Sequence, residues 1–223
     1  MSLLNKLAIL RGTDKSSEIH NYCVKYEKYL PFSRTDKLKI MEIGILNGES
    51  LRMWKDYFIL SNIVGIDITK ECKQYEEERI TVEIGSQIDE NFLNEVCERH
   101  GMFDMILDDG SHKNDHVIFS FKKLFKYVKP GGVYVVEDAC TSYWEDYGGG
   151  FRKDGSSIEY FKGLVDDVNL RGLINYDYHN VHARREDTMI PYVLKHHPDC
   201  ITDIESINFL NGIILITKSN VTL

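Results

Sequence analysis

The sequence predicts an α/β fold in which helices cover both faces of a mostly parallel, seven-stranded sheet that ends in an antiparallel hairpin. Short apolar segments alternate with amphipathic segments of helical spacing between residues 39 and 136. Near the end, two apolar segments flank an Asn-Gly turn at 211–212, which is typical of a hairpin. A chain of 223 residues is long enough for one such domain with a substantial core.

The segment before the sheet is helical and polar, with a break at 11–14 and an end at Pro31. We expect residues 1–35 to form a helical lid or cap region and residues 36–223 to form the main domain. The apolar pattern then predicts, in chain order, strands at 39–45, 63–67, 80–84, 103–107 and 133–136, and helices at 50–60, 90–100 and 115–128. A turn is predicted at 129–132, and the hairpin strands at 201–209 and 213–217.

Composition excludes several classes of partner. The chain is 43% apolar and 28% charged, with a net charge of −8, so it lacks the general basic character that binds nucleic acid or anionic membranes. No apolar run approaches the length of a membrane span, and the first ten residues lack a small-residue cleavage site, so no signal peptide is expected. The five cysteines are widely spaced and odd in number, which indicates reduced thiols and a cytoplasmic protein.

A glycine-containing turn follows the first predicted strand. Glu42, Gly44 and Gly48 lie where that strand leads into a helix, and the glycines allow a sharp turn and close approach of a ligand. The spacing is G-x-x-x-G rather than the dinucleotide fingerprint, and a simple strand-to-helix turn explains it equally well by itself. Asp67 ends the second strand, where it can accept hydrogen bonds from both ribose hydroxyls or cap the helix after Thr69. Together with the glycine turn, the ribose interpretation is preferred.

Four carboxylates and a histidine follow the fourth and fifth strands. Asp108, Asp109 and His112 come after one strand and Glu137 and Asp138 after the other, so they converge at adjacent strand ends. Clustered carboxylates repel unless a cation neutralises them, and hard oxygen ligands suit Mg²⁺, Mn²⁺ or Ca²⁺. His112 can take a proton from a hydroxyl. The alternative is that the aspartates cap loops and His112 lies on the surface, but the whole constellation favours a functional site.

Several motifs resemble the bacterial sugar O-methyltransferases, which include macrolide enzymes that methylate a deoxysugar hydroxyl. They are GTDK at 12–15, MEIGILNG at 41–48, DDGSH at 108–112, VVEDACTSYW at 135–144 and the closing hairpin. The resemblance runs from Gly12 to Lys218, and DDGSH followed by ED and TSYW is its most specific part. It implies a Rossmann-like class I methyltransferase fold that uses S-adenosylmethionine.

The resemblance also implies roles for individual residues. It implies Mg²⁺ or Mn²⁺ held by Asp109, Glu137 and Asp138, with two acceptor hydroxyls completing the coordination, and it suggests His112 as the general base. It also suggests residues that contact S-adenosylmethionine, among them Lys15, which with Asp14 belongs to a lid over the cofactor, and Asp108, which lies near the amino end of the cofactor. The full set is Lys15, Glu42, Gly44, Asp67, Ser86, Gln87 and Asp108, of which Asp108 and Glu42 are the candidates for the amino group.

The acceptor is a sugar-containing small molecule on this interpretation. Tyr143 and Trp144 follow the predicted metal ligands and form either an aromatic wall against the sugar or ordinary packing, two interpretations of equal weight. The glycine-rich stretch 145–156 is an acceptor loop or a plain surface loop. Histidines and arginines at 179–185 contact a phosphate if the acceptor is a nucleotide sugar, although a solvated polar stretch is favoured. The family also leads us to expect a homo-oligomer.

Metal-assisted O-methylation is therefore the predicted activity, in which the metal lowers the pKa of the acceptor hydroxyl and His112 removes its proton. Three alternatives remain open at this point. In the first, the acceptor is a catechol or phenol. In the second, the protein is a non-haem iron hydroxylase, which usually needs two histidines and a carboxylate. In the third, it is a non-catalytic domain that binds the cofactor or a metal.

Overall fold

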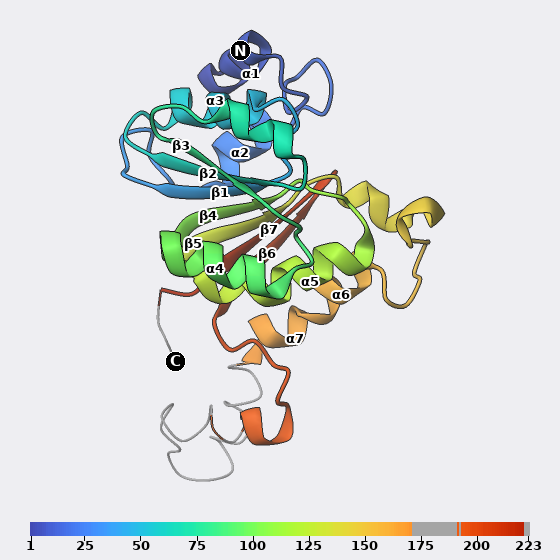
Figure 1. The fold of residues 1–223 in the computed structure, drawn as a ribbon. Coiled ribbons are helices and arrows are strands. Elements are labelled where there is room, and N and C mark those ends of the chain that lie inside the picture. The colour runs from blue at the N-terminus through green and yellow to red at the C-terminus, as the bar shows by residue number, and fades with distance from the viewer. Residues whose placement is uncertain (171–190, 192, 221–223) are drawn as a thin grey trace.

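The structure is a computed structural model that describes residues 1–170, 191 and 193–220, and it has three layers with the sheet in the middle (Figure 1). The seven strands follow the order β3-β2-β1-β4-β5-β7-β6. Their bounds are β1 Lys39–Ile43, β2 Asn62–Asp67, β3 Ile80–Ile84, β4 Phe103–Asp108, β5 Val128–Val136, β6 Ile204–Leu210 and β7 Ile213–Lys218. Strands β1 to β5 pair in parallel, whereas β7 is antiparallel to both β5 and β6. The predicted fold is confirmed.

Helices cover both faces of the sheet, with α1, α2 and α3 on one face and α4, α5 and α6 on the other (Figure 1). Their bounds are α1 Leu3–Arg11, α2 Cys23–Tyr29, α3 Glu49–Tyr57, α4 Glu90–His100, α5 Asn114–Leu124, α6 Ser157–Gly163 and α7 Val165–Val168. Short 3₁₀ helices lie at η1 Lys70–Tyr75, η2 Phe125–Tyr127, η3 Ala139–Tyr143 and η4 Glu145–Tyr147. Helix α5 shows the predicted spacing, because Val117, Phe121 and Leu124 are buried on one face.

The start of β5 differs from the sequence prediction. Residues 129–132 were expected to form a turn, but β5 already begins at Val128 and includes them. The pairing of β5 with β4 shifts register between Phe103 and Met105, and Gly131 has a φ of +74°. Residues 129–132 thus belong to β5 at an irregularity of its pairing with β4, and Gly131 supplies the left-handed backbone there.

The N-terminal helices pack directly on the sheet layer. Leu4 and Ala8 of α1 and Tyr26 of α2 belong to the same buried cluster as Trp54 of α3 and Ile40 of β1. The Tyr26 ring meets the Trp54 ring edge-on, with 5.0 Å between centroids. Burial of each large apolar side chain stabilises the fold by about 1.5–3 kcal/mol. This packing holds the connecting segment between α1 and α2 at the carboxyl ends of the central strands.

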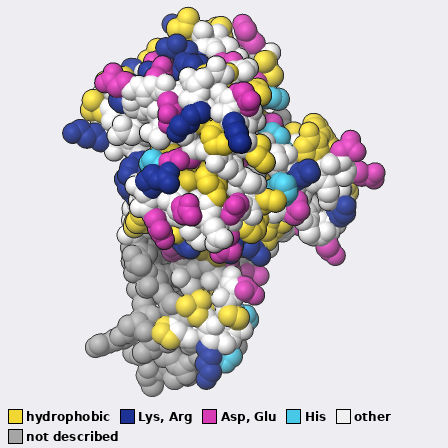
Figure 2. Space-filling model, viewed as in Figure 1, with side chains coloured by type: hydrophobic (Ala, Val, Ile, Leu, Met, Phe, Trp, Pro, Cys, Tyr) yellow, Lys and Arg dark blue, Asp and Glu magenta, His cyan; other side chains and the backbone are white. Residues whose placement is uncertain are grey.

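No helix in the described part of the chain is long and apolar enough to cross a membrane. On the face seen in Figure 2, Lys and Arg side chains are interspersed with Asp and Glu side chains.

Candidate active site

The central strands bring two acidic loops together. β4 lies between β1 and β5, with Ile43 opposite Asp108 and Asp108 opposite Val136. The residues that follow remain tied to the sheet, because the Asp109 amide donates to the Ile43 carbonyl and the Glu137 amide donates to the Asp108 carbonyl, both at 3.0 Å. The two loops therefore leave the sheet side by side, as expected for the carboxyl ends of adjacent parallel strands.

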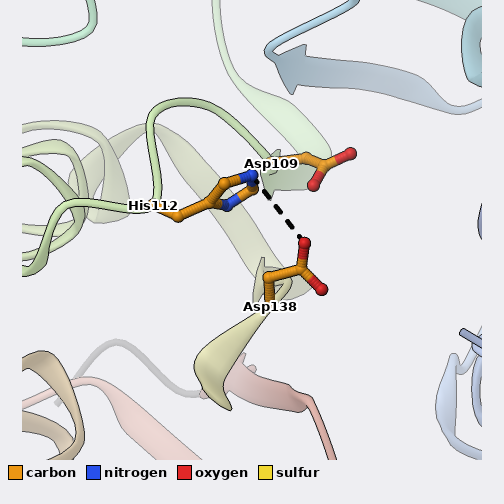
Figure 3. A group of neighbouring side chains, drawn as sticks. All are labelled: Asp109, His112 and Asp138. Atoms are coloured by element: carbon orange, nitrogen blue, oxygen red, sulfur yellow. Dashed lines mark ion pairs between the residues drawn. The ribbon is translucent and has the colours of Figure 1, made fainter. Parts of the chain in front are cut away.

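An outer group on these loops consists of Asp109, His112 and Asp138. One ligand atom from each lies within 4.8 Å of the other two, and the three side chains face a common space (Figure 3). His112 Nε2 is 3.8 Å from Asp138 Oδ2. His112 and Asp138 both have left-handed backbones, with φ of 57° and 48°, which costs on the order of 1 kcal/mol or more for a residue other than glycine. Such strain at two residues of one group is typical of a functional site.

An inner group lies behind the outer one and centres on Lys15. Lys15 Nζ is 2.5 Å from Asp109 Oδ2, 2.8 Å from Glu137 Oε2 and 3.4 Å from Glu42 Oε1. The Lys15 side chain is 1% exposed, so these ion pairs are shielded from water. The sequence predicted Lys15 as a cofactor contact in a lid, and the structure places it between carboxylates of three strand ends. Sequence reasoning missed this role because Lys15 and Asp109 are 94 positions apart.

Burial sets the ionisation of this inner group. Burial raises the pKa of Glu42 to about 7, with Lys15 opposing the rise and Asp109 adding to it. Burial would lower the pKa of Lys15, but the surrounding carboxylates raise it well above its usual value, so the ammonium stays charged. The pKa of Glu137 is raised by burial and by the nearby Asp109 charge. One ammonium thus faces three carboxyl groups, and burial and mutual repulsion make it costly for all three to be ionised at once.

Two tyrosines from the N-terminal segment complete the acidic site. Tyr22 donates its hydroxyl to Asp138 Oδ1 at 2.5 Å, and Tyr26 donates to Glu137 Oε1. Burial raises the pKa of both tyrosines, so the hydroxyls stay protonated and act as donors. Both contacts join residues more than 100 positions apart, and no signal in the sequence pointed to them.

Four predicted cofactor contacts line one cavity of about 240 Å³ at the ends of β1, β2 and β3: Gly44, Asp67, Ser86 and Gln87. A second cavity of about 470 Å³ is lined by Gly44 and Asp67 as well as by Asp109, His112 and Asp138. Because the two cavities share lining residues, they adjoin, and the cleft runs from the glycine turn to the outer group. Gly44 has a φ of +83°, and a Cβ there would lie 2.2 Å from the Asp109 carbonyl oxygen. The close approach of the two loops therefore requires glycine at this position.

Asp67 is held by backbone amides at the rim of this cleft. Its carboxylate accepts hydrogen bonds from the amides of Ile45 at 3.0 Å, Leu46 at 3.3 Å and Thr69 at 2.8 Å. Burial alone would raise the pKa of Asp67, but these hydrogen bonds lower it, so the carboxylate stays ionised. Both sequence interpretations of Asp67 are thus compatible with its position, because it caps the turn at Thr69 and also lines the cleft.

Asp108 and Gln87 point inward and support the DDGSH loop. Asp108 is 1% exposed, is not among the residues lining either cavity, and accepts hydrogen bonds from Gln87 Nε2 at 3.2 Å and the Tyr134 hydroxyl at 3.3 Å. Burial raises the pKa of Asp108 to about 6. Gln87 Oε1 accepts from the Ser111 amide at 2.7 Å. Asp108 is therefore buried and does not line the cleft itself, but it contacts Gln87, a predicted cofactor residue that does.

Aromatic side chains flank the outer group. Tyr143 and Trp144 are 45% and 52% exposed, so neither is a core residue. The Trp144 ring lies 5.8 Å from that of Tyr147, which in turn lies 6.4 Å from the His112 ring. Tyr147 was not singled out from the sequence, although it follows TSYW closely. The basic stretch 179–185 lies outside the described residues.

Sequence comparison finds similar curated proteins. The chain is 39% identical to demethylmacrocin O-methyltransferase from Streptomyces fradiae over 180 residues, which are 76% of this chain and 45% of that protein. It is 37% identical to mycinamicin VI 2''-O-methyltransferase from Micromonospora griseorubida over 180 residues, with the same two coverages. The chain spans about half the length of these curated relatives. No protein-family model matches the chain.

Structure comparison points to the same group of proteins. The fold matches the MycE methyltransferase from the mycinamycin biosynthetic pathway, solved in complex with Mg, SAH and mycinamycin VI, with a TM-score of 0.80 and 30% identity. The match covers 97% of this chain and 54% of that one. The predicted likeness to deoxysugar O-methyltransferases is confirmed in both sequence and fold.

Proposed function

Because the chain is similar to deoxysugar O-methyltransferases in sequence and fold, we propose that it transfers a methyl group from S-adenosylmethionine to a sugar hydroxyl with the help of Mg²⁺ or Mn²⁺. One observation carries the proposal. The outer group Asp109, His112 and Asp138 opens onto the same cleft that Gly44 and Asp67 line. A cofactor site and a candidate metal and base site thus adjoin, as a direct transfer between bound groups requires.

In this proposal, S-adenosylmethionine binds at the end of the cleft that the glycine turn lines. S-adenosylmethionine supplies a methyl group that is already activated by a neutral thioether leaving group. Asp67 is ionised and rim-exposed, so it accepts hydrogen bonds from ribose hydroxyls, while Gly44 lets the backbone approach the ligand. Ser86 and Gln87 line the same cavity as Gly44 and Asp67, and Glu42 and Lys15 are buried.

The acidic end of the cleft fits a divalent cation. Carboxylate oxygens are the preferred donors of Mg²⁺ and Mn²⁺, and the ligand atoms of Asp109 and Asp138 belong to one group within 4.8 Å. Glu137, the third predicted ligand, has its two oxygens engaged by Lys15 and Tyr26. The metal, when bound, lowers the pKa of the acceptor hydroxyl. The assignment of Asp109, Glu137 and Asp138 as ligands is part of the proposal.

His112 serves as the general base in this mechanism. Its ring faces the same space as Asp109, and its Nε2 lies 3.8 Å from Asp138 Oδ2 (Figure 3). His112 removes the hydroxyl proton as the oxygen attacks the methyl carbon, and the sulfonium leaves as a thioether. Tyr143 and Trp144, which are exposed and follow Asp138 by a few residues in the chain, are assigned to the acceptor.

The alternative enzyme class has weaker support. A non-haem iron hydroxylase usually binds its metal through two histidines and one carboxylate, whereas the group found among the described residues contains one histidine and two carboxylates. A non-catalytic cofactor-binding domain would have no use for a strained histidine facing two carboxylates. We further propose that residues 1–35 act as a cap, that the enzyme is a cytoplasmic homo-oligomer, and that its partners are small molecules rather than nucleic acid or membrane.

Titration calorimetry tests the proposal. We expect S-adenosylmethionine to bind the wild-type protein, and Mg²⁺ to bind the wild type but not the Asp109→Ala variant. Because Asp109 lies in the acidic half of the cleft, the variant should retain cofactor binding. An acceptor panel containing deoxysugar glycosides and catechols then separates sugar from phenol methylation. Failure of the cofactor to bind under any condition would overturn the proposed activity.

A further inference from the structure

The ammonium of Lys15 stands where a cation neutralises the acidic strand ends. It contacts Asp109 at 2.5 Å and Glu137 at 2.8 Å, and both are residues that we propose as metal ligands. Glu42 lies 3.4 Å away, and both of its carboxylate oxygens are buried. Lys15 thus does for this group part of what a divalent cation would do.

Asp109 belongs to the inner and the outer group at once. One of its oxygens is in contact with Lys15, while the residue also contributes a ligand atom to the group with His112 and Asp138. Two cations that share one partly buried carboxylate repel each other. Lys15 and a metal ion at Asp109 are therefore in competition.

Local contacts tie Lys15 to the segment that joins α1 to α2. The segment begins at Gly12, which ends α1 with a φ of +79°. The Lys15 carbonyl accepts from the amides of Tyr22 at 3.0 Å and Cys23 at 3.2 Å, so the lysine is tied to the start of α2. Tyr22 itself donates to Asp138. A displacement of Lys15 from Asp109 would therefore also displace the residues between 13 and 23 that are hydrogen-bonded to it.

We propose that Lys15 is a built-in competitor of the metal: it docks the N-terminal segment on Asp109 and Glu137 in the metal-free protein and withdraws from Asp109 when the metal binds. The inference rests on the proposed metal site. Lys15 is a positioning residue in this scheme, since it acts on the acceptor only through the metal ligands. A purely structural role would instead make its removal weaken metal binding.

Manganese binding measures the competition directly. The free Mn²⁺ signal in electron paramagnetic resonance gives the dissociation constant for the wild type, for Lys15→Met and for Lys28→Met. Lys28 lies on the exposed side of α2, so its variant is a control for the loss of one positive charge. We expect Lys15→Met to bind Mn²⁺ about tenfold more tightly or better, and Lys28→Met to match the wild type. Equal or weaker binding by Lys15→Met would overturn the inference.

Hydrogen exchange of the wild-type protein provides a test that does not depend on a variant folding. We expect amides of residues 13–23 to exchange faster with Mn²⁺ bound than without it, because Lys15 has released Asp109. Unchanged or slower exchange there, in protein shown to hold Mn²⁺, contradicts the inference and leaves the proposed function standing. Failure of both the wild type and Lys15→Met to bind Mn²⁺ removes the metal site itself, and with it both proposals.

Discussion

The two halves of the cleft are built in different ways. At the ends of β1 and β2, Asp67 is held by three backbone amides of neighbouring strand ends, and the Gly44 amide donates to the Ile66 carbonyl at 2.8 Å. At the ends of β4 and β5, the carboxylates are held by side chains from the N-terminal segment, such as Lys15. The first half therefore forms together with the sheet, whereas the second is completed only when that segment packs on it.

Electrostatics separates the two halves as well. Backbone hydrogen bonds lower the pKa of Asp67 and keep it charged, while burial raises the pKa of Glu42 to about 7. A carboxylate that stays ionised because backbone amides donate hydrogen bonds to it can also accept hydrogen bonds from the hydroxyl groups of a neutral ligand. A crowded, buried group of acids with one lysine instead favours an added cation. Four changes, from the largest expected effect to the smallest, test whether the halves act independently.

His112→Ala should affect the acidic half alone. We expect turnover to fall by about 10²–10⁴-fold, which is typical for removal of a general base, with the affinity for S-adenosylmethionine unchanged. Steady-state kinetics and calorimetry measure the two quantities. His100→Ala is the control, because His100 ends α4 and pairs with Glu83 away from the cleft. Near-full turnover of His112→Ala would show that the base is assigned wrongly, and a large loss of cofactor affinity would couple the halves.

Glu42→Gln should alter the pH dependence of stability. Because burial raises the pKa of Glu42 from 4.5 to about 7, the folded wild type holds a proton in this range that the unfolded chain has released. The Glu42 contribution therefore lowers the free energy of unfolding as pH rises from about 4.5 to 7, by at most about 3 kcal/mol. Chemical denaturation across this range should show a flatter profile for Glu42→Gln.

Glu77→Gln is the matched control for the pH experiment. Hydrogen bonding by Lys55 outweighs burial and lowers the pKa of Glu77, so its effect on stability lies below about pH 4.5. This variant should keep the slope of the wild type between pH 5 and 7. A wild-type profile that Glu42→Gln leaves unchanged would mean that Glu42 is ionised throughout this range.

Asp67→Asn should affect the cofactor half alone. We expect the dissociation constant for S-adenosylmethionine to rise by about tenfold to a hundredfold, because hydrogen bonds to a charged acceptor contribute about 1.5–3 kcal/mol. Turnover at saturating cofactor should stay within a few-fold of the wild type. Asp89→Asn is the control, since Asp89 also accepts a backbone amide hydrogen bond, from Phe92 at the start of α4, but lines neither cavity. Equal effects of the two changes on affinity would contradict the ribose assignment.

Trp144→Ala should have the smallest effect, at the acceptor side of the acidic half. Loss of an aromatic contact is worth about 0.5–1.5 kcal/mol, so we expect the KM for the acceptor to rise by about three- to tenfold. The affinities for cofactor and Mg²⁺ should not change, because Trp144 is half exposed and is not among the residues lining either cavity. An unchanged KM would favour a role in surface packing.

The type of most elements and their order along the chain were predictable because they depend on local patterns. The segment 80–84 is a strand and 90–100 is a helix in both the prediction and the structure. The motifs after β4 and β5 were therefore expected at one edge of the sheet, and Asp109 and Asp138 do meet there. The turn predicted at 129–132 was wrong, since these residues belong to β5 at an irregularity of its pairing with β4.

By itself, the sequence determined the order of the elements, the parallel sheet with its hairpin and the glycine turn beside Asp67, because periodicity and turn chemistry act over a few residues. Only the tertiary structure decided which way individual side chains face. It buried Lys15 between Asp109 and Glu137, and it buried Asp108 against Gln87 and Tyr134, although Asp109, the next residue in the chain, lines the cleft. Successive residues of an extended segment point to opposite sides, and contacts across 94 or 122 positions arise only from packing of the whole chain.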